Sequence, residues 1–153
     1  MDLPTLGTRY ANSRALVIGI NRYKSAPPLG YAVNDATAVS EILTATFEFP
    51  KQNVRLLVDR QATRSAIMKH YLSLAGDGTE PNDRVVVFFA GHGHTSSSRR
   101  GEVGFLVPFD GESNDFHSLI RWDELTRNAD LISAKHILFL MDACYGGLAI
   151  TRA

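Results

Sequence analysis

Four short apolar runs recur along the chain and are separated by longer, mixed stretches. They occupy residues 15–20, 54–58, 84–89 and 136–141, and each is rich in Val, Ile, Leu or Phe. Runs of this length, built from β-branched and aromatic residues, predict strands that are buried on both faces. We therefore expect four main strands in the core of the protein.

The stretches between these runs carry apolar residues at helical spacing. Asn34 and Asp35 offer two side-chain acceptors at the start of a first helix, and Thr63 is a suitable cap for a second. A third helix is expected over residues 118–128, around the only tryptophan. The apolar residues expected to share one helix face are Ala36, Val39 and Leu43 in the first helix and Ile67, Tyr71 and Leu74 in the second.

Strands that alternate with helices predict an α/β fold with right-handed crossovers and a mainly parallel sheet. Helices on both faces of that sheet would make a three-layer αβα sandwich. Residues 95–101 are polar and are expected to form a mobile loop, and residues 105–108 are expected to form a short edge strand or hairpin. We expect a polar leader at residues 1–13 and one domain over residues 14–153.

Composition argues against several broad classes of protein. The 153 residues are 44% hydrophobic and 21% charged, which is typical of a globular domain. Sixteen Lys and Arg balance sixteen Asp and Glu, so we expect neither nucleic acid nor a membrane as a partner. A single cysteine permits no internal disulfide, and no signal peptide or membrane span is visible. A cytoplasmic location is therefore expected.

Two of the predicted strands end in residues that carry chemistry. Residues 137–141 lead into Asp142 and Cys144, and residues 85–89 lead into His92. The carboxyl ends of parallel strands meet at one edge of a sheet, which is where ligands bind in open α/β folds. A cysteine and a histidine at such ends predict a catalytic dyad.

The dyad would have the chemistry of a thiol hydrolase. The thiolate of Cys144 would be the nucleophile, and His92 would take its proton and return it to a leaving amine. Gly91 and Gly93 would let the backbone approach a substrate closely. The backbone N–H groups of Gly93 and Cys144 would hold the oxyanion. The alternative interpretation is that Cys144 is a small buried hydrophobe and His92 an ordinary loop histidine.

The two strand ends resemble the His and Cys boxes of the caspase-like cysteine peptidases. The boxes are Ala90-Gly91-His92-Gly93 and Asp142-Ala143-Cys144-Tyr145-Gly146, and the spacing is 144 − 92 = 52 residues. In caspases the His lies about 50 residues before the Cys. Residues 15–21, 29–35 and 104–110 resemble further segments of the family, so the similarity spans roughly residues 14–148. It implies a caspase-like αβα fold and cysteine endopeptidase activity, carried by the large-subunit portion of the domain.

The residue before Ala143 separates the branches of this family. Animal caspases carry Gln there, whereas Asp142 matches metacaspases and their prokaryotic relatives, the orthocaspases. In those enzymes this acid and the one matching Asp35 line the pocket for the residue before the scissile bond, which implies cleavage after Arg or Lys. Asp35 also suits the start of a helix, where a carboxylate complements the dipole. The positions that depart from many metacaspases are Ala32, Ala90 and Tyr145, which replace Cys, Ser and His.

Metal chemistry has weaker support in the sequence. His94 could join His117 or Asp110 as a ligand, but this set is too sparse for zinc. Several metacaspases require calcium, and Asp123 and Glu124 fall near the place where some of its acidic ligands occur. A complete set of oxygen ligands is not identifiable. We therefore expect no metal site and no cofactor, and we leave calcium dependence open.

Two classes of function follow. The first is a cysteine endopeptidase whose partners are proteins or peptides with a basic residue before the scissile bond. The alternative is a caspase-like binding or signalling module with little proteolytic activity of its own. It stays open because the sequence continues for only 153 − 144 = 9 residues after Cys144. The family's domain continues with a small subunit that completes the sheet and pocket, so we expect that segment or a downstream domain as a partner.

Overall fold

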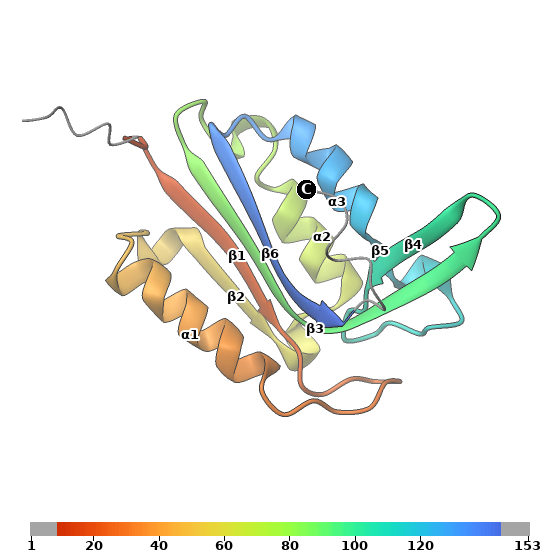
Figure 1. Cartoon of the computed structure of the whole chain (residues 1–153). Coiled ribbons are helices and arrows are strands. Elements are labelled where there is room, and N and C mark those ends of the chain that lie inside the picture. The colour runs from red at the N-terminus through yellow and green to blue at the C-terminus, as the bar shows by residue number, and fades with distance from the viewer. Residues whose placement is uncertain (1–8, 145–153) are drawn as a thin grey trace, which may run out of the picture.

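The computed structural model describes residues 9–144, with Asp77 and Cys144 described by their backbone alone. Strands and helices alternate along most of this range (Figure 1). In chain order they are β1 Ser13–Gly19, α1 Ala32–Ala45, β2 Val54–Val58, α2 Arg64–Leu72, β3 Arg84–Ser98, β4 Gly101–Leu106, β5 Ile120–Arg121, α3 Trp122–Asn128 and β6 His136–Cys144.

The parallel part of the sheet contains the four strands that the apolar runs predict. β1 pairs with β2 and with β3, and β6 pairs with the other edge of β3, all in parallel. The order β2-β1-β3-β6 therefore brings the carboxyl ends of all four strands to one edge of the sheet. β3 and β6, which carry the two predicted boxes, are neighbours in it.

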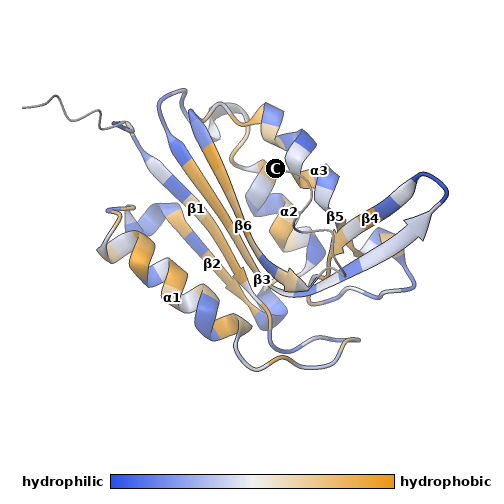
Figure 2. Cartoon of the chain, viewed as in Figure 1, coloured by the Kyte–Doolittle hydropathy of each residue, from blue (hydrophilic) through white to orange (hydrophobic). Residues whose placement is uncertain are grey.

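Helices cover both faces of this sheet, so the predicted three-layer α/β fold is confirmed (Figure 1). β1 illustrates how both faces of the sheet are buried, because alternate residues of a strand point to opposite faces. Leu16 and Ile18 belong to a core on the side of α2 and α3, whereas Ala15 and Val17 belong to a smaller core under α1. Figure 2 shows the apolar residues concentrated in the parallel strands and in the helix faces that meet them.

The clearest departure from the sequence prediction is the length of β3. Residues 95–98, predicted to lie in a mobile loop, continue this strand and pair with β4 in an antiparallel hairpin. Polar residues fit here because the hairpin projects beyond the helices, and its tip is hydrophilic in Figure 2. Residues 105–108 were predicted to form an edge strand or a hairpin: residues 105 and 106 end β4 of the hairpin, and β4 also pairs with β5, so it is not an edge strand.

Helix starts were predicted with mixed success. Thr63 caps α2 as expected, because its hydroxyl accepts the Ala66 N–H at 3.1 Å. α1 begins at Ala32 rather than at Asn34, and its start has no side-chain cap. α3 begins at Trp122, because residues 116–121 form a 3-10 turn and the short strand β5. No helix within residues 9–144 is long and apolar enough to cross a membrane.

The described part of the predicted polar leader contacts the amino end of the sheet. The Tyr10 hydroxyl lies 3.0 Å from Nδ1 of His136, and the side chain of Asn53 donates to that of Asn12 at 3.0 Å. Residue 13 already belongs to β1. Residues 10–13, which fall in the predicted leader, thus contact the sheet or belong to it.

Candidate active site

The two predicted catalytic residues lie side by side on neighbouring strands. In the parallel register of β3 and β6, Ala90 pairs with Asp142 and His92 pairs with Cys144. Backbones of adjacent strands are about 4.8 Å apart. Residues that lie 52 positions apart in the sequence are thus brought together at the carboxyl end of the sheet. The thiol itself is outside the described part of the chain.

The ring of His92 is held by a backbone carbonyl. Its Nε2 lies 2.8 Å from the carbonyl oxygen of Pro27. A carbonyl oxygen only accepts hydrogen bonds, so Nε2 must carry the proton in this contact. In the neutral ring Nδ1 is then the basic nitrogen. The Pro27 contact therefore assigns one nitrogen as donor and leaves the other free to accept a proton.

Tyr23 supports the same histidine from its backbone side. Its hydroxyl accepts the His92 N–H at 2.7 Å, and the two rings lie 4.9 Å apart. Burial is the main cause that raises the pKa of Tyr23 to about 12, with a smaller contribution from the Asp59 carboxylate; the His92 N–H bond opposes them. The phenol therefore stays neutral and acts as a fixed acceptor over the range in which proteins function.

This tyrosine also explains Gly91. A Cβ at that position would overlap the Tyr23 hydroxyl and crowd the ring of Phe89. Gly91 is buried, so the prediction that it lets a substrate approach the backbone is wrong. Its missing side chain makes room for Tyr23, which in turn holds His92.

The loop that supplies Tyr23 and Pro27 is tied to the end of β2. One carboxylate oxygen of Asp59 accepts the N–H groups of Asn21 and Arg22, both at 2.9 Å. Asp59 has φ 48°, in the left-handed region that few non-glycine residues adopt. A hydrogen-bonded Asp tolerates this conformation better than most residues do. Asp59 therefore anchors the start of the loop that supports His92.

The predicted oxyanion donor Gly93 lies where β3 passes from β6 to β4. The Val107 N–H donates to the His92 carbonyl at 3.0 Å, so the carbonyl of His92 points toward β4, while its N–H donates to Tyr23 on the same side of β3. Successive residues of a strand direct these groups to alternate sides, so the Gly93 N–H points away from β4 and toward the side of β3 on which β6 lies. The second predicted donor, the Cys144 N–H, belongs to the last described residue of β6.

The two acids predicted to select substrate lie on the same side of the sheet. Asp142 pairs with Ala90, which belongs to the core under α1, so its side chain shares that face. Asp35 lies in the first turn of α1, at the same end. Both side chains are exposed. Asp142 is exposed because α1 packs over β1, β2 and β3, whereas the strand that carries Asp142, β6, lies at the edge of the parallel strands.

Residues considered as metal ligands have other contacts. A carboxylate oxygen of Asp110 accepts the Arg64 N–H at 2.8 Å, and Glu124 forms an ion pair with the Arg64 side chain at 3.1 Å. Asp123 pairs with Arg121 at 2.8 Å. His94 packs against aromatic rings. Among the residues that the structure describes, no three His, Cys, Asp or Glu side chains are placed to hold a metal ion.

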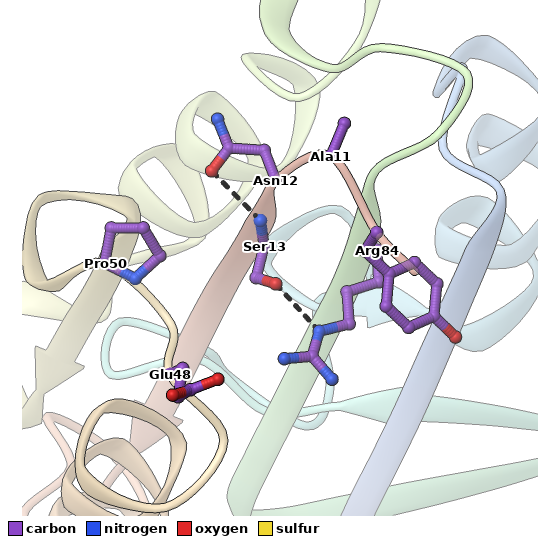
Figure 3. A pocket seen from close by; sticks show the side chains of 7 residues that line it. Ala11, Asn12, Ser13, Glu48, Pro50 and Arg84 are labelled. Carbon is purple, nitrogen blue, oxygen red and sulfur yellow. Dashed lines mark hydrogen bonds between the residues drawn. The ribbon is translucent and has the colours of Figure 1, made fainter. Parts of the chain in front are cut away.

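A pocket of about 320 Å³ lies at the opposite end of the strands (Figure 3). The Arg84 Nε donates to the Ser13 hydroxyl at 2.7 Å, and the guanidinium lies over the rings of Tyr10 and Phe49. None of the predicted site residues lines it. These contacts join β1, β3 and the end of α1, so they have a structural role.

Tyr23, Pro27 and Asp59 are therefore site residues that the sequence prediction missed. Pro27 contributes a carbonyl, which every residue has, so its identity carries no signal. Tyr23 and Asp59 looked like ordinary loop and strand-end residues. The one available signal was that glycine precedes His92, because a buried glycine indicates that another group occupies the place of its side chain.

Comparisons with known proteins give an independent view of the same chain. A family model described as "Caspase domain" matches residues 12–151. Metacaspase-1 of Eremothecium gossypii is 26% identical over 158 residues, which cover 91% of this chain and 33% of that protein. Metacaspase-1A of Aspergillus oryzae is 30% identical over 138 residues, with 86% and 28% covered. Metacaspase-2 of Arabidopsis thaliana is 26% identical over 155 residues, with 90% and 35% covered.

A solved structure supports the fold. A protein from Geobacter sulfurreducens matches 91% of this chain and 53% of its own, with a TM-score of 0.73 and 22% sequence identity. The chain spans about a third of the length of the curated relatives named above. The predicted resemblance is confirmed, because the family model covers most of the sequence. This chain belongs to the caspase-domain family of cysteine peptidases.

Proposed function

We propose that this chain is the catalytic part of a cysteine endopeptidase that cleaves after Arg or Lys. The observation that carries the proposal is the pairing of His92 with Cys144 across β3 and β6. The Pro27 carbonyl adds to it, because it assigns the proton of His92 to Nε2 and leaves Nδ1 as the base.

The reaction would proceed in two steps. His92 takes the thiol proton, and the Cys144 sulfur forms a bond to the scissile carbonyl carbon while the π electrons move to its oxygen. The oxyanion then collapses, the C–N bond breaks, and the leaving nitrogen receives the proton from His92. In the second step water, deprotonated by His92, attacks the thioester, and the thiol is regenerated with release of the acid product.

The oxyanion would be held by the N–H groups of Gly93 and Cys144. The support is the direction of the Gly93 N–H, which points away from β4 toward the β6 side of β3. Donors already aimed at the developing charge need no reorganisation during the reaction. Loss of one such donor typically costs about 100- to 1000-fold in rate.

The preference for a basic residue would come from Asp142 and Asp35. Both carboxylates are at the carboxyl end of the sheet, on the α1 side, and a cation between them would relieve their repulsion. Arg matches this arrangement best, because its guanidinium donates to two carboxylates in fixed directions.

A small-subunit segment would pack against β6. Leu138 and Leu140 are 51% and 42% exposed, on the face of β6 that continues the core under α1. A further segment over this face would cover both leucines and would wall the pocket at Asp142. Changing both leucines to Ser should therefore weaken association with that segment, whereas Leu131→Ser, an exposed control on the turn after α3, should not.

No cofactor is required by this mechanism, and we propose a cytoplasmic site of action, which suits a free thiol. Calcium dependence is decided by the assay itself: activity that disappears in EGTA and returns with Ca²⁺ would add a metal to the scheme. The two carboxylates first considered for it, on Asp123 and Glu124, are paired with arginines.

The decisive experiment tests nucleophile and specificity together. A peptide electrophile with Arg at its reactive end should modify Cys144, as detected by intact mass and peptide mapping, and Cys144→Ala should abolish both the adduct and peptide hydrolysis. Matched Lys and Asp electrophiles rank the preference, and faster reaction with Asp would contradict the assignment of Asp142.

The same assay separates the two classes of function. It is carried out on this chain alone and on any longer product of its gene. Activity only in the longer protein would support a site completed by a small subunit. A folded protein that hydrolyses nothing in either form would favour the binding module.

A further inference from the structure

Beyond His92, residues from β3, β4 and the 3-10 turn at residues 116–118 form a group of aromatic rings that the proposed chemistry does not use. The ring of His94 lies 6.1 Å from that of Phe105 and 6.2 Å from that of Phe116, measured between centroids. Phe105 and Phe116 are stacked, with centroids 5.1 Å apart and planes 12° from parallel. We call these three residues the aromatic shelf.

The shelf has a buried base and an exposed surface. Phe105 is 4% exposed and belongs to a small core with Val107 and Leu119, whereas Phe116 is 52% exposed. His94 is half-buried. An exposed aromatic ring that is stacked on a buried one has a fixed position, and it can remove apolar surface of a ligand from water without first ordering itself.

The shelf is continuous with the proposed catalytic site. His94 lies two residues after His92 on the same strand, a distance of about 6.6 Å along β3. Phe105 is its register partner on β4. Tyr23, whose ring contacts His92, also packs against the core that holds Phe105. One continuous surface therefore leads from His92 to Phe116.

The position of the shelf relative to His92 determines which part of a bound substrate could reach it. In the proposed function, His92 returns its proton to the leaving nitrogen, which must come within hydrogen-bond reach of the ring. The chain that departs with that nitrogen therefore starts at His92. β6 pairs with β3 up to Cys144, while β3 continues past His92 to Ser98. Residues after the scissile bond are thus directed along this continuation of β3.

We propose that the aromatic shelf binds an apolar or aromatic side chain at the first or second residue after the scissile bond. The inference rests on the proposed function and deepens it, because it adds a preference on the leaving side to the one for Arg on the other side. The spacing supports this range, since an extended peptide advances about 3.3 Å per residue, or about two residues over the distance from His92 to His94.

The experiment compares kcat/KM among peptides that differ only after the scissile bond. The substrates are internally quenched peptides with the same sequence up to and including Arg. They differ at the two positions that follow, which carry Gly, Leu or Phe. The wild-type protein, in the form that hydrolyses peptides, should show kcat/KM about 5- to 10-fold higher for Leu or Phe than for Gly at one of these positions. In Phe116→Ala this ratio should fall to about twofold or less, and Phe116→Trp should retain it.

Phe47→Ala is the matched control. Phe47 is 51% exposed, nearly as much as Phe116, but it follows the last turn of α1 at the opposite end of the sheet. This variant should retain the wild-type ratio. Melting temperatures of all variants show whether a change reflects folding. If Phe116→Ala is unstable, a peptide with benzoylphenylalanine at the preferred position is photo-crosslinked to Cys144→Ala, and the adduct should map to the shelf.

The outcomes separate two failures. Three results would overturn the shelf assignment while the peptidase proposal stands. The protein could hydrolyse the Gly, Leu and Phe peptides equally well, Phe116→Ala could leave the wild-type ratio unchanged, or the crosslink could map outside the shelf. Failure to hydrolyse any peptide would overturn the proposed function, and the shelf assignment with it.

Discussion

The two ends of the parallel sheet are built from the same strands and contain similar residues, but they use them differently. At the amino end, β3 begins with Arg84, whose side chain binds the Ser13 hydroxyl (Figure 3). Its guanidinium also donates to the Phe47 carbonyl and lies over the rings of Tyr10 and Phe49. At the carboxyl end, the His92 ring hydrogen-bonds to the Pro27 carbonyl and packs against the Tyr23 ring, and Asp142 is exposed. At the amino end, many polar contacts join neighbouring elements. At the carboxyl end, the polar side chains make fewer contacts, as the proposed chemistry requires.

The histidines of the two ends show the difference most directly. His136 opens β6 and its Nδ1 meets the Tyr10 hydroxyl, which is both donor and acceptor. His92 meets the carbonyl of Pro27, which only accepts. The proton of His92 is therefore assigned by its partner, while that of His136 is not. A general base needs this assignment, so His92 meets a requirement of its proposed role, whereas His136 makes a contact between β6 and the segment before β1.

The largest expected effect separates these two histidines. His92→Ala should lower kcat by about 100- to 10,000-fold, because no base remains to activate Cys144. His136→Ala should leave kcat unchanged, since it removes only the Tyr10 contact. Steady-state kinetics on an Arg peptide, with melting curves for both variants, measure this. Equal losses in the two variants would show that the amino end also serves catalysis.

The next effect concerns stability at the amino end. Asp83 is 1% exposed; it accepts the Glu80 N–H at 2.9 Å and faces Arg14 at 3.6 Å. Asp83→Ala should lower the free energy of unfolding by about 2–3 kcal/mol, because it removes the acceptor of the Glu80 N–H and leaves the partly buried Arg14 guanidinium without its counter-charge. Asp123→Ala, which breaks exposed ion pairs, should cost about 0.5 kcal/mol or less. Urea denaturation compares the two, and similar losses would contradict the role of burial.

Tyr23→Phe tests how the carboxyl end holds its histidine. Loss of the hydroxyl leaves the His92 N–H without its acceptor, which should cost about 1–2 kcal/mol of stability and lower kcat about 5- to 20-fold, with KM unchanged. Tyr71→Phe is the control, because burial also raises the pKa of Tyr71 to about 12 and its hydroxyl donates to the Leu125 carbonyl, far from the dyad. It should lower stability while kcat per folded molecule is retained.

The smallest effect is a pH dependence near the amino end, in the last turn of α2. Partial burial, followed by Arg55 and Lys69, lowers the pKa of His70 below its usual value of 6.5. The unfolded chain therefore takes up a proton at higher pH than the folded one, so this group reduces stability as pH falls through about 6.5. The gap in unfolding free energy between wild type and His70→Gln should change between pH 7.5 and 5.5. A constant gap would contradict the shift.

Much of the domain could be predicted from local patterns. The apolar runs located four strands, Thr63 marked the start of α2, and the two boxes placed His92 and Cys144 at strand ends. These predictions worked because burial periodicity, capping and motif spacing are properties of neighbouring residues. A general rule, that parallel strands bring their carboxyl ends to one edge, then placed both boxes at the same edge of the sheet. The strand order, with β6 next to β3, came only from the structure.

Other features depended on contacts between distant parts of the chain. Tyr23 and Pro27 reach His92 across 69 and 65 residues, and no local pattern distinguishes them from other loop residues. Polar residues 95–98 form a strand only because β4 pairs with them.

The sequence by itself therefore determined which elements form and which residues can carry the chemistry, because propensity and side-chain identity are local. Only the tertiary structure decided which nitrogen of His92 holds the proton, why Gly91 must be glycine and which rings continue the site beyond the dyad. Each of these depends on which groups packing brings within hydrogen-bond or van der Waals reach of one another.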